Sequence, residues 1–359
     1  MAADPSTLYE RTRDARRILV VDLGFLGDSV HLVPACWDLK RHYPEARIET
    51  LSAPVGGELL AMAPCVDRAW IYPLGNPSPP WWRHLGILRE IRRQRFDLAL
   101  SFGAADRAVF ITALSGARHR VVHNRGRKHF YNPWILPHWV PLQPRDRSIL
   151  EQRRGVLSAM GLTPGPVRFD LRIPDADRAW AAAELPERVI HVSPSASHAL
   201  KEWPIEHWCA LVPQLAARSG AVLVATGDGS ARERERLQRL ADSAGPRAKI
   251  FGERLSLARL AALLERSALH VGADSGVTHL AAALGVRTVT VYREYDGRTE
   301  WSPPGANHRQ CVVDCACIAS TRPGPECAGP QRAACLARIT PDQLLAECVT
   351  AWREGMAPK

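Results

Sequence analysis

The sequence of 359 residues has no apolar run of the roughly 18 residues that a membrane-spanning helix needs. Its first 17 residues, MAADPSTLYERTRDARR, lack the apolar core of a secretory signal peptide, so we expect a cytoplasmic protein. Helix-turn-helix, zinc-finger and RNP signatures are missing, and nucleic acid is therefore not an expected partner. No G-x-G-x-x-G motif follows the first apolar run, which argues against a nicotinamide-dependent dehydrogenase.

Composition and charge favour a globular protein that binds anions. Hydrophobic residues make up 46% of the chain and charged residues 23%, and the length suits two domains better than one. The formal net charge is +10, with an excess of arginine, whose planar group binds anions through paired contacts. Phosphates, acidic sugars and anionic lipid headgroups are candidate ligands, although a basic surface that only improves solubility explains the same charge.

The first half of the chain reads as the start of an open parallel sheet. Strands alternate with helices there: strands at 18–21, 47–51 and 97–102, and helices that end near 40 or span 85–95 and 148–160. Residues 118–144 are basic, aromatic and proline-rich, which predicts either an irregular segment over a cleft or a poorly structured surface loop. The polar residues 172–187 are the predicted interdomain linker.

The second half repeats this alternation, with strands at 189–192, 222–225, 249–251, 269–271 and 288–292 and helices at 205–218, 231–241, 257–266 and 278–284. The pattern predicts an α/β fold of two Rossmann-like domains that face each other across a cleft. We expect the two domains to be residues 1–172 and residues 173–340, with a ligand bound in the crevice at the carboxyl ends of the strands. An amphipathic helix in residues 341–359 is expected to pack back across both domains.

A glycine turn follows the first strand and ends in a carboxylate. Gly24 and Gly27 allow the chain to turn tightly, and Asp28 lies at the entrance of the next helix. Asp28 is a candidate catalytic group, although a helix cap is an equally ordinary role for an aspartate there.

Hydroxyl and lysine side chains follow the first strand of the second half. Ser195, Ser197 and Lys201 precede a helix whose first turn carries Pro204, and together they suit a diphosphate. The alternative is a serine-rich turn with a solvated lysine.

A third block, Gly-Ala-Asp-Ser-Gly-Val-Thr-His at 272–279, leaves the apolar strand at 269–271. An anion could bind at the start of the helix that follows, and Asp274 would suit sugar hydroxyls. Alternatively, Asp274 caps the helix and His279 is a packed helix residue.

Together these blocks resemble glycosyltransferase family 9, the ADP-heptose:lipopolysaccharide heptosyltransferases. The family motif L-G-x-x-G-D is matched at 23–28 and K-x-W-P at 201–204. The T-G-x motif is matched at 226–228, and D-S-G-x-x-H-x-A-A-A at 274–283. The motifs occur in the family's order over most of the chain.

The resemblance implies a GT-B fold, with the acceptor bound by the N-terminal domain and the nucleotide-sugar by the C-terminal one. It implies that Asp28 is the base that deprotonates an acceptor hydroxyl as that oxygen attacks the anomeric carbon with inversion. Lys201, with Ser195 and Ser197, would stabilise the leaving diphosphate without a metal.

The resemblance also assigns the remaining candidates. The donor sugar and phosphates would be held by Asp274, Ser275, Gly276, Thr278 and His279. The nucleotide pocket would be lined by Thr226, Gly227, Asp228, Leu255 and Ser256. The acceptor side would include Gly27. Arg118 and Arg120 lie in a basic stretch of the same half, and their charges suit an acidic or phosphorylated glycan.

Two regions differ from the family or invite another reading. The family's G-P-T-D-P turn is replaced by Tyr-Arg-Glu-Tyr-Asp-Gly at 292–297, so the donor sugar or base can differ. Cysteines near the end of the chain could ligate a structural zinc or iron, although they lack a C-x2-C pair and packed thiols are the alternative: Cys315, Cys317, Cys327 and Cys335.

The leading hypothesis is an inverting heptosyltransferase that needs no cofactor and transfers heptose from ADP-heptose to an acceptor such as the lipopolysaccharide inner core. We expect it in the cytoplasm, with peripheral contact at the inner face of the cytoplasmic membrane. A related enzyme with another sugar donor and a protein or small-molecule acceptor is the first alternative. The second is a non-catalytic nucleotide-sugar-binding protein.

Overall fold

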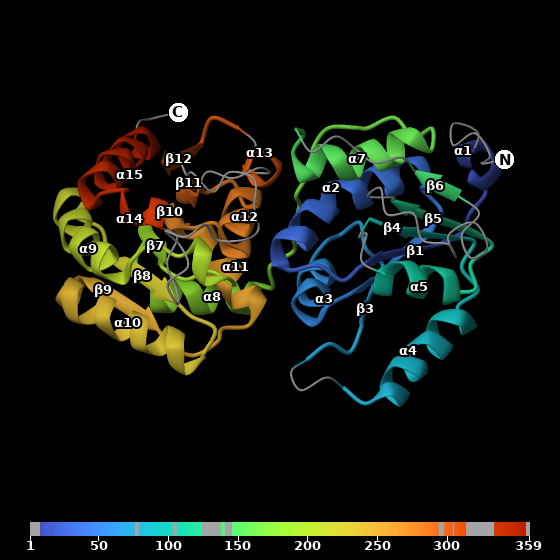
Figure 1. Cartoon of the computed structure of the whole chain (residues 1–359), viewed down its shortest axis with the longest axis horizontal. Helices are drawn as coiled ribbons and strands as arrows, with labels where there is room; N and C mark the ends of the chain where they lie inside the picture. Colours follow the sequence, from blue (N-terminus) through green and yellow to red (C-terminus); the bar gives the residue numbers. More distant parts are fainter. Residues whose placement is uncertain are drawn as a thin grey trace. The chain divides into compact units, whose positions relative to one another are not determined.

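The computed structural model describes residues 8–75, 79–102, 106–123, 138–140, 146–293, 298–303, 305–313 and 334–356. The chain divides into two compact units, Met1–Arg172 and Ile173–Lys359. Each unit is built on its own six-stranded parallel sheet with helices on both faces (Figure 1). The predicted α/β class with two Rossmann-like halves is therefore confirmed.

The first unit has strands in the order β3-β2-β1-β4-β5-β6. The strands are β1 (Arg17–Asp22), β2 (Arg47–Ser52), β3 (Arg68–Ile71), β4 (Leu98–Ser101), β5 (His119–His123) and β6 (His138–Val140). The helices are α1 (Leu8–Thr12), α2 (Leu26–His42), α3 (Pro54–Ala61), α4 (Trp81–Arg93), α5 (Asp106–Leu114) and α7 (Ile149–Ala159). Because the strand order reverses between β1 and β4, a ligand site is expected at their carboxyl ends.

The apolar sequence of β1 explains its central position. All of its residues after Arg17 are buried, as a strand covered on both faces requires. Helices α2 and α7 pack against each other on one face of the sheet, and α5 covers the other face (Figure 1). Leu19 and Ile111 share the core with the aromatic rings of Trp70 and Phe96.

The second unit has strands in the order β12-β11-β10-β7-β8-β9. The strands are β7 (Val189–Ser193), β8 (Leu223–Thr226), β9 (Ala248–Phe251), β10 (Ser267–Ala273), β11 (Arg287–Arg293) and β12 (His308–Val313). The α-helices are α8 (Asp175–Glu184), α9 (Ile205–Ser219), α10 (Ala231–Ala244), α11 (Leu257–Glu265), α12 (Gly276–Ala283), α13 (Arg298–Trp301), α14 (Ala334–Ala337) and α15 (Pro341–Met356). The strand order reverses between β7 and β10, so these strands flank the second expected ligand site.

Two helix layers enclose this second sheet. Helices α9, α10 and α15 pack together as one layer, and α8, α11 and α12 form the other (Figure 1). Trp203 and Trp208 are fully buried in the first layer with their rings edge to face, 5.1 Å between centroids. Helix α15 contacts α9, β10, β11 and β12 of its own unit. Its expected packing across both domains stays a prediction.

Two segments that we expected to be irregular contain regular elements, although the division between the units falls at the first residue of the predicted linker. Strands β5 and β6 lie within residues 118–144, and helix α8 lies within the predicted linker. The basic residues around β5 hide its strand character, since Val121 and Val122 become buried between neighbouring strands. Helix α8 starts after Pro174 and carries Asp175 and Asp177 in its first turn, where acidic side chains favour a helix.

Of the helices in the described ranges, none has both the length and the apolarity that a membrane crossing requires.

Candidate functional site

Asp28 lies in the first turn of α2, beside the carboxyl end of β1. Its Oδ2 accepts the backbone N–H of Phe25 at 2.9 Å, which is the capping role that the sequence allowed. Its Oδ1 accepts a hydrogen bond from Arg153 Nη2 at 3.1 Å. The side chain keeps 20% of its surface exposed. Both contacts orient the carboxylate, and part of it stays open to solvent.

Arg153 is the residue of this site that the sequence did not reveal. It lies on α7, and its side chain is only 4% exposed. Its Nη1 is 2.6 Å from Oδ2 of the buried Asp22, the last residue of β1. One guanidinium therefore joins Asp22 to Asp28 and orients the candidate base.

Gly24 makes room for this carboxylate. A Cβ atom at position 24 would lie 2.4 Å from Cγ of Asp28. The Gly24 N–H also donates to Asp22 Oδ1 at 2.8 Å, which ties the turn to the end of β1. The glycine in the motif is thus explained by the close approach of the Asp28 side chain.

The three residues assigned to the acceptor side do not all lie near Asp28. Gly27 is buried beside it in the first turn of α2. Arg118 precedes β5 and Arg120 lies near its amino end, whereas Asp28 follows the carboxyl end of the parallel β1. The arginines therefore lie at the amino ends of the strands, opposite to the end at which Asp28 lies. Their contact with an acceptor stays a prediction.

In the second unit, the structure brings two of the predicted donor-site residues together. Lys201 ends the 3-10 turn Ala199–Lys201 that follows β7, and Asp274 follows β10. Lys201 Nζ is 2.8 Å from Asp274 Oδ2, and the carboxylate is 6% exposed against 33% for the lysine. This ion pair spans the point where the strand order reverses, and there a cation and a carboxylate can meet a phosphate and a sugar hydroxyl.

The two serines of residues 194–201, which we call the donor segment, differ in exposure. Ser195 is buried and Ser197 is exposed. The N–H of Ala196, between them, donates to Glu202 Oε1 at 3.0 Å. Glu202 is the variable residue of the K-x-W-P motif, and sequence analysis gave it no role.

The start of α12 carries the hydroxyl of Ser275 and the buried imidazole of His279. Ser275 is the N-cap, and its Oγ is buried without a hydrogen-bond partner among the described residues. Gly276 follows it as the first helical residue. Burial lowers the pKa of His279 to about 4, despite the opposing effect of Asp274. His279 is therefore a neutral, packed residue, as the alternative reading held, and its contact with phosphate stays a prediction.

A chain of buried hydrogen bonds runs beneath this site. Thr278 Oγ1 donates to the Ala273 carbonyl at 2.8 Å, so it accepts from His270 Nε2 at 3.0 Å. Burial lowers the pKa of His191 to about 3, and burial beside His191 holds the pKa of His270 well below its usual value. Both rings are neutral. His270 Nδ1 therefore accepts from His191 Nδ1 at 2.8 Å, and His191 Nε2 accepts from Thr226 Oγ1 at 3.0 Å.

This series of hydrogen bonds crosses β8, β7 and β10 and ends at α12. It links the T-G-x motif to the D-S-G-x-x-H motif, which are far apart in the sequence. Gly272 is required beside it, because a Cβ there would lie 2.6 Å from His270 Nε2. Neither histidine belongs to a motif, and only the fold brings them together.

The other predicted nucleotide residues make local contacts. Asp228 Oδ1 accepts the Ser230 N–H at 2.7 Å, and Ser256 caps α11 by accepting the Arg259 N–H at 3.2 Å. Gly227 bonds through its N–H to the Phe251 carbonyl, and Leu255 is partly buried against an apolar cluster. Their contact with a nucleotide stays a prediction.

Comparison with known proteins identifies the family. Residues 84–324 match the family model of Glycosyltransferase family 9 (heptosyltransferase), which is more than half of the chain. The chain belongs to glycosyltransferase family 9. It is accordingly a glycosyltransferase enzyme, and the recognition made from its motifs is confirmed.

Relatives of this glycosyltransferase share its length and fold. It is 22% identical over 292 residues to lipopolysaccharide heptosyltransferase 3 of Escherichia coli, covering 78% of this chain and 84% of that one. It is 23% identical over 350 residues to lipopolysaccharide heptosyltransferase 2 of Salmonella typhimurium, covering 92% and 97%. The solved structure of E. coli ADP-heptose lps heptosyltransferase II has a TM-score of 0.76 at 20% identity and covers 95% and 100%. This match shows a GT-B heptosyltransferase fold.

Three of the four cysteines that we considered as metal ligands lie outside the described residues: Cys315, Cys317 and Cys327. Cys335 is buried in the apolar cluster that contains Leu336 and Ile339. Within the described ranges, no three histidine, cysteine or acidic side chains form a group that could hold a metal ion.

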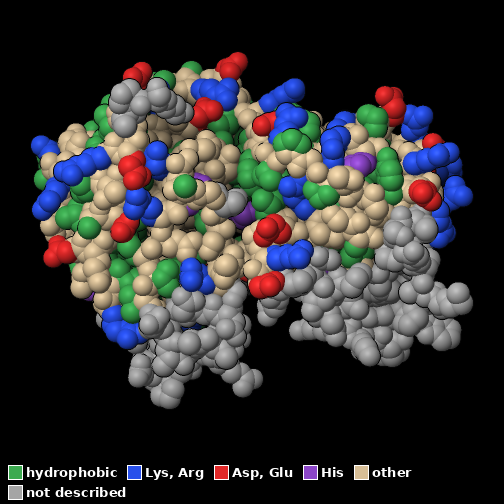
Figure 2. All heavy atoms as spheres, turned by 90° about the horizontal axis from the view of Figure 1, so that it is seen from above, with side chains coloured by type: hydrophobic (Ala, Val, Ile, Leu, Met, Phe, Trp, Pro, Cys, Tyr) green, Lys and Arg blue, Asp and Glu red, His purple; other side chains and the backbone are tan. Residues whose placement is uncertain are grey.

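Charged side chains of the enzyme are spread over both units. On the face drawn in Figure 2, lysine and arginine side chains are interspersed with acidic ones. The net charge of +10 is therefore not gathered into a single patch on this face.

Proposed function

We propose that this enzyme transfers heptose from ADP-heptose, with inversion at the anomeric carbon, to an acidic or phosphorylated glycan or glycolipid. The lipopolysaccharide inner core is the acceptor that we propose, since the relatives are lipopolysaccharide heptosyltransferases. ADP-heptose is proposed because the E. coli enzyme with the same fold carries that donor in its name. No cofactor beyond the donor is part of the proposal.

The Lys201–Asp274 pair is the observation that carries the proposal. In the proposed complex the Lys201 ammonium turns from the carboxylate toward the diphosphate and stabilises its charge as it leaves. Asp274 then accepts hydrogen bonds from hydroxyls of the donor sugar. The buried hydroxyl of Ser275 and the first N–H groups of α12 supply further donors for the phosphates.

Asp28 is proposed as the general base. Its carboxylate is partly exposed, and Arg153 and the Phe25 N–H orient it. It would take the proton of the acceptor hydroxyl as that oxygen attacks the anomeric carbon, and ADP would leave from the opposite face.

A thermal-shift panel of nucleoside diphosphates and their sugars tests the donor. A donor present at about 100 times its Kd stabilises the folded protein by about 2.7 kcal/mol, which raises Tm by roughly 5–10 °C. We expect this rise with ADP and ADP-heptose and not with the uridine or guanosine compounds. A preference for UDP or GDP would overturn the donor assignment.

Heptose transfer to inner-core acceptor lacking its heptose tests the reaction, and the anomeric configuration of the product tests inversion. A different sugar transferred to a protein or a small molecule is the second candidate. It is favoured by residues 292–297, which depart from the family motif and of which 294–297 lie outside the described residues. Absence of transfer to the inner core, with transfer to such an acceptor, would select it.

Peripheral membrane contact is proposed through α4. Its outer face carries the exposed side chains of Trp82, Leu85, Arg89 and Arg93, whereas Ile91 faces the core. An aromatic ring with arginines on one helix face suits an anionic membrane surface. We expect the enzyme to sediment with phosphatidylglycerol vesicles, and the double variant W82S/R89E to stay in solution. Equal sedimentation of the two proteins would refute this contact.

A further inference from the structure

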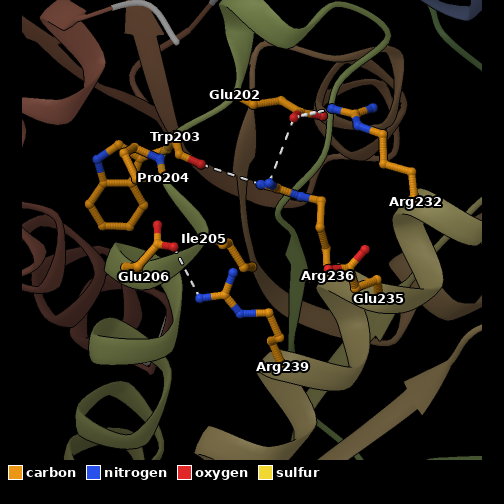
Figure 3. A pocket seen from close by; sticks show the side chains of 9 residues that line it. All are labelled: Glu202, Trp203, Pro204, Ile205, Glu206, Arg232, Glu235, Arg236 and Arg239. Carbon is orange, nitrogen blue, oxygen red and sulfur yellow. Dashed lines mark hydrogen bonds and ion pairs between the residues drawn. The ribbon is translucent and has the colours of Figure 1, made fainter. Parts of the chain in front are cut away.

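A pocket of about 370 Å3 lies behind the donor segment of the second unit. It is lined by residues 202–206 of the K-x-W-P block and the start of α9, and by Arg232, Glu235, Arg236 and Arg239 of α10 (Figure 3). The arginines extend toward Glu202 and Glu206 across the pocket (Figure 3).

Glu202 connects this pocket to the donor segment. Its side chain is 6% exposed, and Oε1 accepts the Ala196 N–H at 3.0 Å. Its Oε2 is paired with Arg232 and lies 3.7 Å from Arg236 Nη1. A carboxylate this deeply buried needs its cations, and the two arginines therefore keep it aimed at the backbone of the segment.

Arg236 holds the same segment from the other side of Ser195. Its Nη2 donates to the Pro194 carbonyl at 3.0 Å and to the Trp203 carbonyl at 3.3 Å. Peptide groups on both sides of Ser195 are thus bound by one ion pair, which is anchored to the buried Trp203 of the core.

We propose that Glu202 and Arg236 are positioning residues for the donor diphosphate. Their ion pair clamps residues 194–196, and with them Ser195, in one conformation. Because a segment that is already ordered loses little freedom when a ligand binds, the clamp raises donor affinity without touching the donor. The inference rests on the proposed function, which assigns Ser195, Ser197 and Lys201 to the diphosphate.

The test compares E202A with E206A. Glu206 forms an ion pair with Arg239 at 3.0 Å on the rim of the same pocket, and its side chain is 52% exposed against 6% for Glu202. The Kd for ADP is measured by titration calorimetry well below the Tm of each protein, together with the donor KM and kcat. We expect E202A to raise Kd and KM about tenfold. We expect kcat at saturating donor to stay within about threefold, and E206A to match the wild type.

The E202Q variant keeps the inference testable if E202A does not fold. Its amide oxygen still accepts the Ala196 N–H, but the charge that holds the arginines is lost, so we expect a smaller rise in Kd. Folded E202A or E202Q protein with wild-type Kd and KM would overturn the clamp. So would a fall in kcat with unchanged Kd, since that pattern belongs to a role in the chemical step.

Lys201 separates this inference from the proposed function. If K201A weakens ADP binding while E202A and E202Q do not, the donor site stands and the clamp is wrong. If the wild-type enzyme binds no ADP, the proposed function fails and the clamp fails with it.

Discussion

Mild acid should destabilise the second unit through three histidines that are buried and neutral. His191, His270 and His279 are at most 3% exposed, and burial lowers the pKa of each below its usual value of 6.5. The unfolded chain therefore binds more protons than the folded unit once the pH falls below 6.5. Stability is unaffected above that pH and decreases as the pH falls toward the folded pKa values.

The expected loss follows from the two pKa values of about 3 for His191 and about 4 for His279. Each group contributes about 1.4 kcal/mol per pH unit while only the unfolded chain is protonated. Between pH 6.5 and 5, each of these two groups should lower the free energy of unfolding by about 2 kcal/mol. His270 adds to this loss in the same direction.

Urea unfolding, followed by circular dichroism between pH 7.5 and 5, measures this loss. The H279N variant removes one titrating group and leaves the His191–His270 hydrogen bond in place. Between pH 6.5 and 5 it should lose about 2 kcal/mol less than the wild type, whatever its stability at pH 7.5. The H198N variant, which removes an exposed imidazole, should keep the wild-type pH dependence. Equal losses in H279N and the wild type would refute the reasoning.

Three substitutions test the site around Asp28. D28N should lower kcat by about 100-fold or more while ADP affinity is unchanged, and activity within a few-fold of wild type would exclude Asp28 as the base. G24A should lower kcat by about 100-fold, because the new Cβ displaces Cγ of Asp28, and undiminished turnover would contradict that steric argument. R153M should lower the free energy of unfolding by about 3–5 kcal/mol, because it leaves Asp22 buried without its cation. Unfolding in urea at the wild-type midpoint would argue against this ion pair.

The strands and the glycine turn could be predicted because their signals are local. The apolar run at β1 and the turn at Gly24 follow from side chains that are adjacent in the sequence. Their order along the chain also predicts parallel sheets, and the carboxyl ends of β7 and β10 therefore meet. Because Lys201 follows β7 and Asp274 follows β10, their closeness agrees with this arrangement of the strands.

Residues that act through tertiary contacts could not be predicted. Arg153 belongs to an ordinary amphipathic helix and is separated from Asp28 by 125 positions. Nothing near it in the sequence distinguishes it from the many other arginines of this chain. Glu202 occupies the variable position of a motif, but its role depends on Arg236, which reaches it only when α10 packs beside α9.

Several polar residues have structural duties that the motifs conceal. Thr226 donates its hydroxyl hydrogen to His191, and Thr278 donates its own to the Ala273 carbonyl. Ser256 caps a helix. These positions are recognisable in the sequence as parts of the motifs. The sequence does not show whether such a side chain contacts a ligand or the protein itself, because both contacts require the same residue types.

The guanidinium of Arg153 also bears on how the first unit is synthesised. Residues of β1 and α2 are synthesised before those of α7, so Asp22 and Asp28 are made before the cation that they share in the folded unit. Until α7 docks, the hydrogen bonds from Gly24 and Phe25 are in place to shape the turn, but the cation that orients both carboxylates is not. We therefore expect a chain that stops before α7 to retain every motif residue of the first glycine turn and to lack the ion pairs that orient Asp28.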